Sequence, residues 1–140
     1  MDDSQMEARI RKLYAKGDMA EFAKAQHEIA AEDFVQEWPQ SGERNRGRDN
    51  VDKLNQSYEA NTGTAPQMTL RRILKPGEAW VIEGTIDYGD GIPVSAVSIF
   101  EFDAEGKMRR ETDYFANPFE PPAWRSQLVE RMEPEPAAAG

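Results

Sequence analysis

The stretch IPVSAVSIFEFDAEGKMRRETDYFANPFEPPAWR, residues 92–125, decides the fold of this chain. Two runs, Ile92–Phe102 and Lys107–Phe115, flank the short turn DAEG, and this arrangement predicts a β-hairpin. The second run carries Glu111 and Asp113 two residues apart. Because side chains alternate along a strand, both carboxylates are expected on one face of the predicted sheet.

After the hairpin, we expect one more short element and then a tail. Pro121 and Pro122 predict the opening of a final helix that runs from Ala123 to Met132. Residues 133–140 hold two prolines and three alanines, so we expect them to be disordered. The length of 140 residues fits a single domain, which we place at residues 1–132.

Before the hairpin, helical spacing and capping residues predict three helices, and further strands lead into the hairpin. The expected helices run from a Ser4 cap to about Lys16, from an Asp18 cap to about Ala30, and from Val51 to Ala60, and the expected strands are Asp33–Pro39, Met68–Leu74 and Glu78–Asp87. Residues 40–48 are expected to form a polar loop. Helices first and hairpins later are typical of an α+β fold. We therefore expect a curved antiparallel sheet wrapped around three N-terminal helices, with one open, partly apolar cavity.

The composition excludes several classes of function. The chain has no cysteine and one histidine, so it offers no disulfide, no thiolate chemistry and no histidine-rich metal site. Its net charge of −9 opposes binding to nucleic acid or to an anionic membrane, because phosphate contacts need clustered Lys and Arg. No secretory signal and no apolar stretch of membrane-spanning length is evident. We expect a cytoplasmic protein that uses no metal and no cofactor.

The order helix, helix, strand, helix, four strands and helix resembles the nuclear transport factor 2-like superfamily, and within it the SnoaL-like branch. The motifs that carry the resemblance are Gly17-Asp18, Phe34–Pro39, Gly47-Arg48, Glu101–Lys107 and Asp113–Phe115. The resemblance implies a cone-shaped sheet around a pocket, and commonly a homodimer formed through the outer face of the sheet. Relatives include ketosteroid isomerases, limonene-epoxide hydrolases, scytalone dehydratases and polyketide cyclases. Others bind proteins, so the fold alone does not fix the function.

The resemblance also implies roles for individual positions. The general-base aspartate of ketosteroid isomerases corresponds to Trp38, and their oxyanion-hole acid corresponds to Ser98. Their first-helix tyrosine falls near Ile10, which leaves Tyr14 out of register. Epoxide hydrolases and SnoaL-type cyclases of this fold use an aspartate late in the sheet, and Asp113 matches that position. Asp113 is therefore where the chemistry of several relatives converges.

Two carboxyl groups in an apolar pocket lose solvation and repel each other, which raises at least one pKa toward the range useful for proton transfer. On this interpretation Asp113 and Glu111 form the catalytic centre. The alternative is a structural role, in which either carboxylate pairs with a basic side chain such as Arg109 or Arg72.

Aromatic residues are candidates for the pocket wall. Trp38, Trp80 and Phe115 could stack on a flat, apolar ligand, although Trp80 also fits ordinary core packing. Trp124 either closes the mouth of the pocket or fixes the last helix to the sheet.

Charged residues outside the pair have simpler interpretations. His27 is the one side chain that ordinarily titrates near neutral pH. Its polar neighbours Gln26 and Glu28 favour a solvated surface position over a catalytic pair with Asp113. Three arginines in loop 44–48 could clamp an anion, but the flanking acidic residues favour a network of ion pairs.

Two functions therefore remain open. The first is cofactor-independent acid/base chemistry of the cyclase, isomerase or hydrolase type on a small hydrophobic cyclic molecule. Asp113 would be the acid or base, and Tyr58 or Ser98 a hydrogen-bond donor, although Tyr58 also fits a core position. The second is a non-catalytic ligand-binding or dimerisation module, because alternation places Val97 and Ile99 on the outer face of the sheet.

Overall fold

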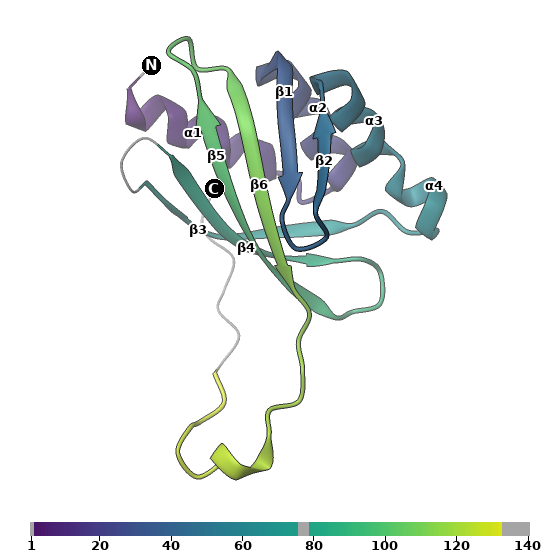
Figure 1. The fold of residues 1–140 in the computed structure, drawn as a ribbon, viewed down its shortest axis with the longest axis vertical. Coiled ribbons are helices and arrows are strands. Elements are labelled where there is room, and N and C mark those ends of the chain that lie inside the picture. Colours follow the sequence, from purple (N-terminus) through teal and green to yellow (C-terminus); the bar gives the residue numbers. More distant parts are fainter. Residues whose placement is uncertain (1, 76–78, 133–140) are drawn as a thin grey trace.

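A curved, open sheet of six strands forms one side of the molecule, and helices lie against its inner face (Figure 1). The computed structural model describes residues 2–75 and 79–132. The helices are α1 (Asp3–Tyr14), α2 (Met19–Ile29), α3 (Arg48–Gln56) and the short α4 (Tyr58–Thr62). The strands are β1 (Ala30–Trp38), β2 (Glu43–Arg46), β3 (Gln67–Leu74), β4 (Trp80–Asp87), β5 (Pro93–Phe102) and β6 (Met108–Ala116), followed by the 3₁₀ turn η1 (Ala123–Arg125). This confirms the predicted α+β fold. The expected strand start at Glu78 and the expected tail at residues 133–140 lie outside the described residues.

The strand order is β2-β1-β6-β5-β4-β3, and one contact in it differs from the expected antiparallel arrangement. The β5–β6 hairpin forms as predicted and places Ser98 opposite Asp113. Strands β3, β4 and β5 are antiparallel neighbours. In contrast, β1 pairs in parallel with β6, and Gln36 lies opposite Glu111. This contact between the two halves of the chain leaves no local signal in the sequence.

The loop expected at residues 40–48 contains a strand. Strand β2, with the sequence ERNR, pairs antiparallel with the end of β1 and lies at the edge of the sheet. A short edge strand of charged and polar residues has no alternation of apolar side chains. The loop prediction was wrong for this reason.

Helix boundaries follow capping chemistry and differ from the prediction at two helices. Helix α1 starts at a capping box between Asp2 and Gln5, and not at Ser4. Helix α2 is capped by Asp18, as predicted. The third expected helix is divided into α3 and α4 at Ser57, whose hydroxyl group donates a 2.6 Å hydrogen bond to a carbonyl of the preceding turn. Such side-chain bonds compete with the helix backbone.

The main core lies between the helices and the inner face of the sheet. Helix α1 buries Met6, Ile10 and Leu13, which share one helical face. Trp80 of β4 belongs to the same core and is 6% exposed. The Nζ atom of Lys75 lies 5.4 Å from the centroid of the Trp80 ring, a distance that suits a cation–π contact.

After β6 the chain leaves the body of the domain, and residues 117–132 extend away from the sheet as an arm (Figure 1). The helix expected from Ala123 to Met132 is wrong, since only the turn η1 forms there. Trp124 is 77% exposed, so it neither closes a cavity nor fixes a helix to the sheet of its own chain. Short helices are marginal without tertiary packing, and Leu128 and Met132 in this arm are exposed as well.

Candidate functional site

A cavity opens between the helices and the inner face of the sheet. It offers about 60 Å³ to the centres of water-sized molecules, and about 590 Å³ of atom-free space when its open mouth is included. One water needs roughly 10–15 Å³ of the smaller measure, so several waters or one small organic molecule fit. The lining combines apolar, aromatic and polar side chains: Tyr14, Met19, Phe22, Gln36, Trp38, Asn55, Tyr58, Met68, Thr69, Ile82, Thr85, Ile86, Tyr88, Ala96, Ser98, Glu111, Asp113 and Phe115, with Gly84.

Glu111 and Asp113 lie on the inner face of β6, and each is 4% exposed. Glu111 accepts two short hydrogen bonds. Gln26 Nε2 donates to its Oε1 atom at 2.6 Å, and Gln36 Nε2 donates to its Oε2 atom at 2.6 Å. Gln26 Oε1 in turn accepts a 3.4 Å hydrogen bond from Asn55 Nδ2, so polar side chains of α2 and α3 hold the Glu111 carboxyl group in place.

Asp113 accepts hydrogen bonds from side chains of two strands, β5 and β1. Ser98 Oγ on β5 donates to Oδ1 at 2.6 Å, and Trp38 Nε1 on β1 donates to Oδ2 at 3.0 Å. Gln36 Nε2 also lies 3.4 Å from Oδ2 and thereby joins the two carboxyl groups. The other amide atom of Gln36, Oε1, is buried and has no hydrogen-bond partner.

Burial dominates the protonation of the carboxyl pair. Burial, and then repulsion from Asp113, raise the pKa of Glu111 well above its ordinary value. Burial also raises the pKa of Asp113, while its hydrogen bonds, that with Glu111 first, oppose the shift. Because the two groups are in contact, they titrate as a pair. Because burial raises the pKa of both groups and each disfavours ionisation of the other, the pair keeps one proton over a range of pH in which its other proton has been lost.

The two basic residues named as alternative partners of these carboxylates, Arg109 and Arg72, pair with other acidic residues. Arg109 Nη2 lies 2.9 Å from Asp33 Oδ2, and Arg72 pairs with Glu83. No Arg, Lys or His is among the described residues that line the cavity.

Tyr14 is a functional candidate that the sequence analysis set aside. It lines the cavity and is hydrogen-bonded to Ser98, and its ring centroid lies 5.0 Å from that of Phe22. Burial, and then repulsion from Glu111 and Asp113, raise the pKa of Tyr14 well above its ordinary value, so its hydroxyl group stays protonated. The signal was present in the apolar helical spacing of Tyr14, but the family alignment had placed the equivalent tyrosine near Ile10.

Four aromatic side chains, Trp38, Tyr58, Tyr88 and Phe115, form what we call the aromatic collar. They line both the cavity and a wider hollow outside it, whose remaining lining residues are Gln40, Ser41, Glu43 and Asn117. The rings of Tyr58 and Tyr88 lie 6.1 Å apart. The structure thus places four of the expected wall and donor residues at the cavity: Trp38, Tyr58, Ser98 and Phe115. Trp80 does not line it, because its side chain is used in the core.

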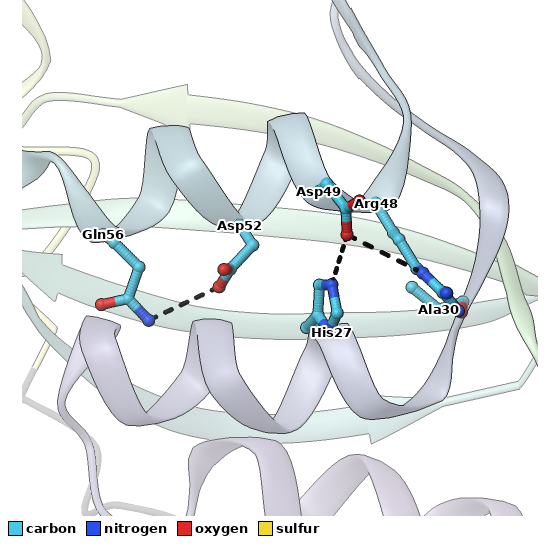
Figure 2. A network of polar contacts seen from close by, with 6 residues as sticks. All are labelled: His27, Ala30, Arg48, Asp49, Asp52 and Gln56. Atoms are coloured by element: carbon cyan, nitrogen blue, oxygen red, sulfur yellow. Dashed lines mark hydrogen bonds and ion pairs between the residues drawn. The ribbon is translucent and has the colours of Figure 1, made fainter.

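His27 does not line the cavity; it lies partly exposed between α2 and α3 (Figure 2). Its Nε2 atom is 2.6 Å from Asp49 Oδ1, and Arg48 Nε lies 4.0 Å from the same oxygen. The hydrogen bond with His27 lowers the pKa of Asp49. In the same view, Gln56 donates to Asp52 one turn away. The surface interpretation of His27 is confirmed, and an His27–Asp113 pair is excluded.

Three comparisons relate this architecture to known proteins. The model of the SnoaL-like domain family matches residues 7–111, and this chain belongs to that family. An NTF2-like protein of unknown function from Burkholderia xenovorans LB400 is similar, with a TM-score of 0.77, 35% identity and coverage of 94% of this chain and 98% of that chain. A ketosteroid isomerase candidate from Kribbella flavida DSM 17836 has a TM-score of 0.74 and 30% identity, covering 98% and 96%.

A protein with a cystatin-like fold from Silicibacter pomeroyi DSS-3 is similar in fold, with a TM-score of 0.61, 22% identity and coverage of 79% of this chain and 72% of that chain. No curated protein matches the sequence. Across residues 2–75 and 79–132, no helix has the length and apolar character needed to cross a membrane. The same residues contain no group of three or more His, Cys, Asp or Glu side chains arranged to hold a metal ion.

Proposed function

We propose that this SnoaL-like protein catalyses cofactor-independent proton transfer, of the isomerase or cyclase type, on a small hydrophobic molecule that binds in the cavity. The observation that carries the proposal is the buried pair Glu111 and Asp113, which faces the cavity without a basic partner among the described lining residues. Such a pair holds one proton and one charge side by side, as acid/base catalysis requires. The similarity to the ketosteroid isomerase candidate supports the same class of chemistry.

In the proposed mechanism, Asp113 is the general base. Its ionised carboxylate takes a proton from a carbon next to a substrate carbonyl. The electron pair of that C–H bond forms a C=C bond, and the π pair of the carbonyl moves to its oxygen. The Tyr14 hydroxyl group stabilises the developing oxyanion by donating a hydrogen bond. Ser98 has a single hydroxyl proton, which it donates to Asp113, so it can accept from Tyr14 until substrate displaces that bond. Asp113 then returns the proton to another carbon as the carbonyl re-forms.

Exchange with solvent deuterium tests this proposal without knowledge of the substrate. Cyclic ketones and enones would be incubated with the protein in D₂O, and deuterium incorporation next to the carbonyl would be followed by mass spectrometry. We expect Asp113→Asn to lower the exchange rate by about 10²- to 10⁴-fold. Glu32→Gln, which removes an exposed carboxylate of β1, is the matched control and should exchange normally. Exchange that survives Asp113→Asn contradicts the assignment of the base.

A non-catalytic ligand-binding role is the second candidate, and Trp38 favours it. This indole occupies the position that corresponds to the isomerases' base and donates to Asp113, which accepts from Gln36 and Ser98 as well. A carboxylate that accepts several hydrogen bonds is a weaker base. Binding of apolar ligands without any deuterium exchange would favour this role.

We also propose that the chain forms a homodimer through the outer face of the sheet. Val97 and Ile99 of β5 are partly exposed on that face, and Tyr114 of β6 is 46% exposed beside them. Sedimentation equilibrium should give twice the chain mass, and replacing Val97 and Tyr114 by lysine and glutamate should return it to one chain mass.

A further inference from the structure

The cavity carries negative charge that none of its described lining residues balances. Both carboxyl groups are buried, and the described residues that line the cavity and the outer hollow include Glu43 but no Arg, Lys or His. The remaining ionisable groups of the described cavity lining are three neutral phenols, Tyr14, Tyr58 and Tyr88, whose pKa values the pair itself helps to raise. A buried charge without a counter-ion is costly, so a ligand that brings a positive charge gains more here than a neutral one.

The aromatic collar supplies a second, independent preference for a cation. Trp38, Tyr58, Tyr88 and Phe115 surround the passage from the outer hollow to the cavity. Aromatic faces attract ammonium groups through their quadrupoles, most strongly where water is excluded. Glu43 in the outer hollow adds a negative charge on the route inward.

Gln36 provides a third observation, which concerns hydrogen bonding. Its Nε2 atom is held by Glu111 and Asp113, while its Oε1 atom is buried and unpaired on a side chain that is 4% exposed and lines the cavity. Buried acceptors are nearly always satisfied in native proteins. A ligand that donates an N–H to Gln36 Oε1 would complete this site.

We propose that the cavity binds a small protonated amine, with its ammonium group between Asp113, Gln36 Oε1 and the aromatic collar and its apolar body against the inner wall. An N–H of the ammonium group satisfies Gln36, its charge balances Asp113, and the rings of the collar cover it. The inference rests on the proposed function in that it uses the same carboxyl pair and assigns the substrate an amine. The inference does not require turnover, because a preference for amines over neutral molecules can be measured by binding alone.

Three probes of similar shape separate the charge of the ligand from its apolar body: cyclohexylamine, cyclohexanol and cyclohexanecarboxylate. Their affinities for the full chain at neutral pH would be measured by calorimetry and by ¹⁵N NMR titration, which reports on the side-chain amide of Gln36. We expect the ammonium form to bind at least tenfold more tightly than the alcohol, with shifts of the Gln36 amide, and the carboxylate not to bind. Equal binding of amine and alcohol, or binding of the carboxylate, overturns the proposal.

Two variants then test whether Asp113 causes the tighter binding of the amine. Asp113→Asn should bring the amine and the alcohol to similar affinities, while Glu32→Gln, which removes an equal charge from the surface, should keep the difference. If both variants lower amine binding equally, the attraction comes from the net charge of −9 and the proposal fails. Should Asp113→Asn not fold, the ranking of the probes on the unmodified chain, together with the Gln36 shifts, still decides. Deuterium exchange without amine preference refutes this inference alone, whereas amine preference without exchange refutes the enzyme proposal alone.

Discussion

The indole Nε1 atom of Trp38 donates a 3.0 Å hydrogen bond to Oδ2 of Asp113. Trp38 ends strand β1 and Asp113 belongs to β6, so the bond crosses the parallel contact between the two halves of the chain. The indole at the position where the resemblance to ketosteroid isomerases places their base therefore donates to Asp113, the base of the mechanism that we propose. The bond opposes the effect of burial on the pKa of Asp113.

Replacing Trp38 by Phe should raise the pKa of Asp113 further. The ring is retained in the aromatic collar, but the donor that favours the ionised carboxylate is lost. A ¹³C NMR titration of the aspartate carboxyl groups would measure the change. Trp124→Phe is the matched control, since Trp124 is exposed in the arm and has no contact with the pair. If the pKa of Asp113 is the same in Trp38→Phe as in the unmodified chain, the indole N–H does not stabilise the ionised carboxylate.

Glu111 makes the stability of the fold depend on pH. Its pKa is raised in the folded state, so the folded protein binds more protons than the unfolded chain above the ordinary glutamate pKa of about 4.3. The free energy of unfolding should therefore be highest at or below that pH and should fall as the pH rises through the raised folded-state value. Glu111→Gln should reduce this dependence of the free energy of unfolding on pH. At a pH above the raised pKa of Glu111, the variant should be more stable than the unmodified chain.

Urea unfolding between pH 4 and pH 8 would measure how the free energy of unfolding depends on pH in the unmodified chain and in Glu111→Gln. The control is again Glu32→Gln, which should keep the slope of the unmodified chain because this carboxylate is exposed on β1. A Glu111→Gln slope that matches the unmodified chain would place the cause of the pH dependence elsewhere. Both oxygens of Glu111 face amide donors, so the new amide finds an acceptor when the Gln36 amide turns its Oε1 atom toward it, in exchange for the bond that Gln36 Nε2 donates in the unmodified chain.

Tyr14→Phe should reduce deuterium exchange by about 10²-fold or more, as the loss of one oxyanion donor does in other enzymes. The ring and its packing against Phe22 are retained, so the free energy of unfolding should change little. Tyr114→Phe removes the same hydroxyl group from the outer face of β6, where the side chain is 46% exposed, and should exchange normally. Equal rates for all three proteins would exclude Tyr14 as the donor.

The sequence predicted the parts of the site that depend on local periodicity. Glu111 and Asp113 were placed on one face because alternation along a strand is strict, and the β5–β6 hairpin put Ser98 opposite Asp113. Gln36 was missed because its contact with Glu111 needs the parallel pairing of β1 and β6, which joins distant segments. A polar residue on an apolar helix face, as in Gln26, is the kind of signal that could have revealed the support behind the pair.

The two tryptophans that do not line the cavity should respond in opposite ways to truncation. Trp80 is buried in the core between helices and sheet, so Trp80→Ala should lower the free energy of unfolding by about 3–5 kcal/mol. Trp124 is 77% exposed, so Trp124→Ala should change it by less than about 0.5 kcal/mol. Urea unfolding at two protein concentrations would measure both. A loss for Trp124→Ala that depends on concentration would contradict this prediction, and would show that the arm packs against a second copy of the chain.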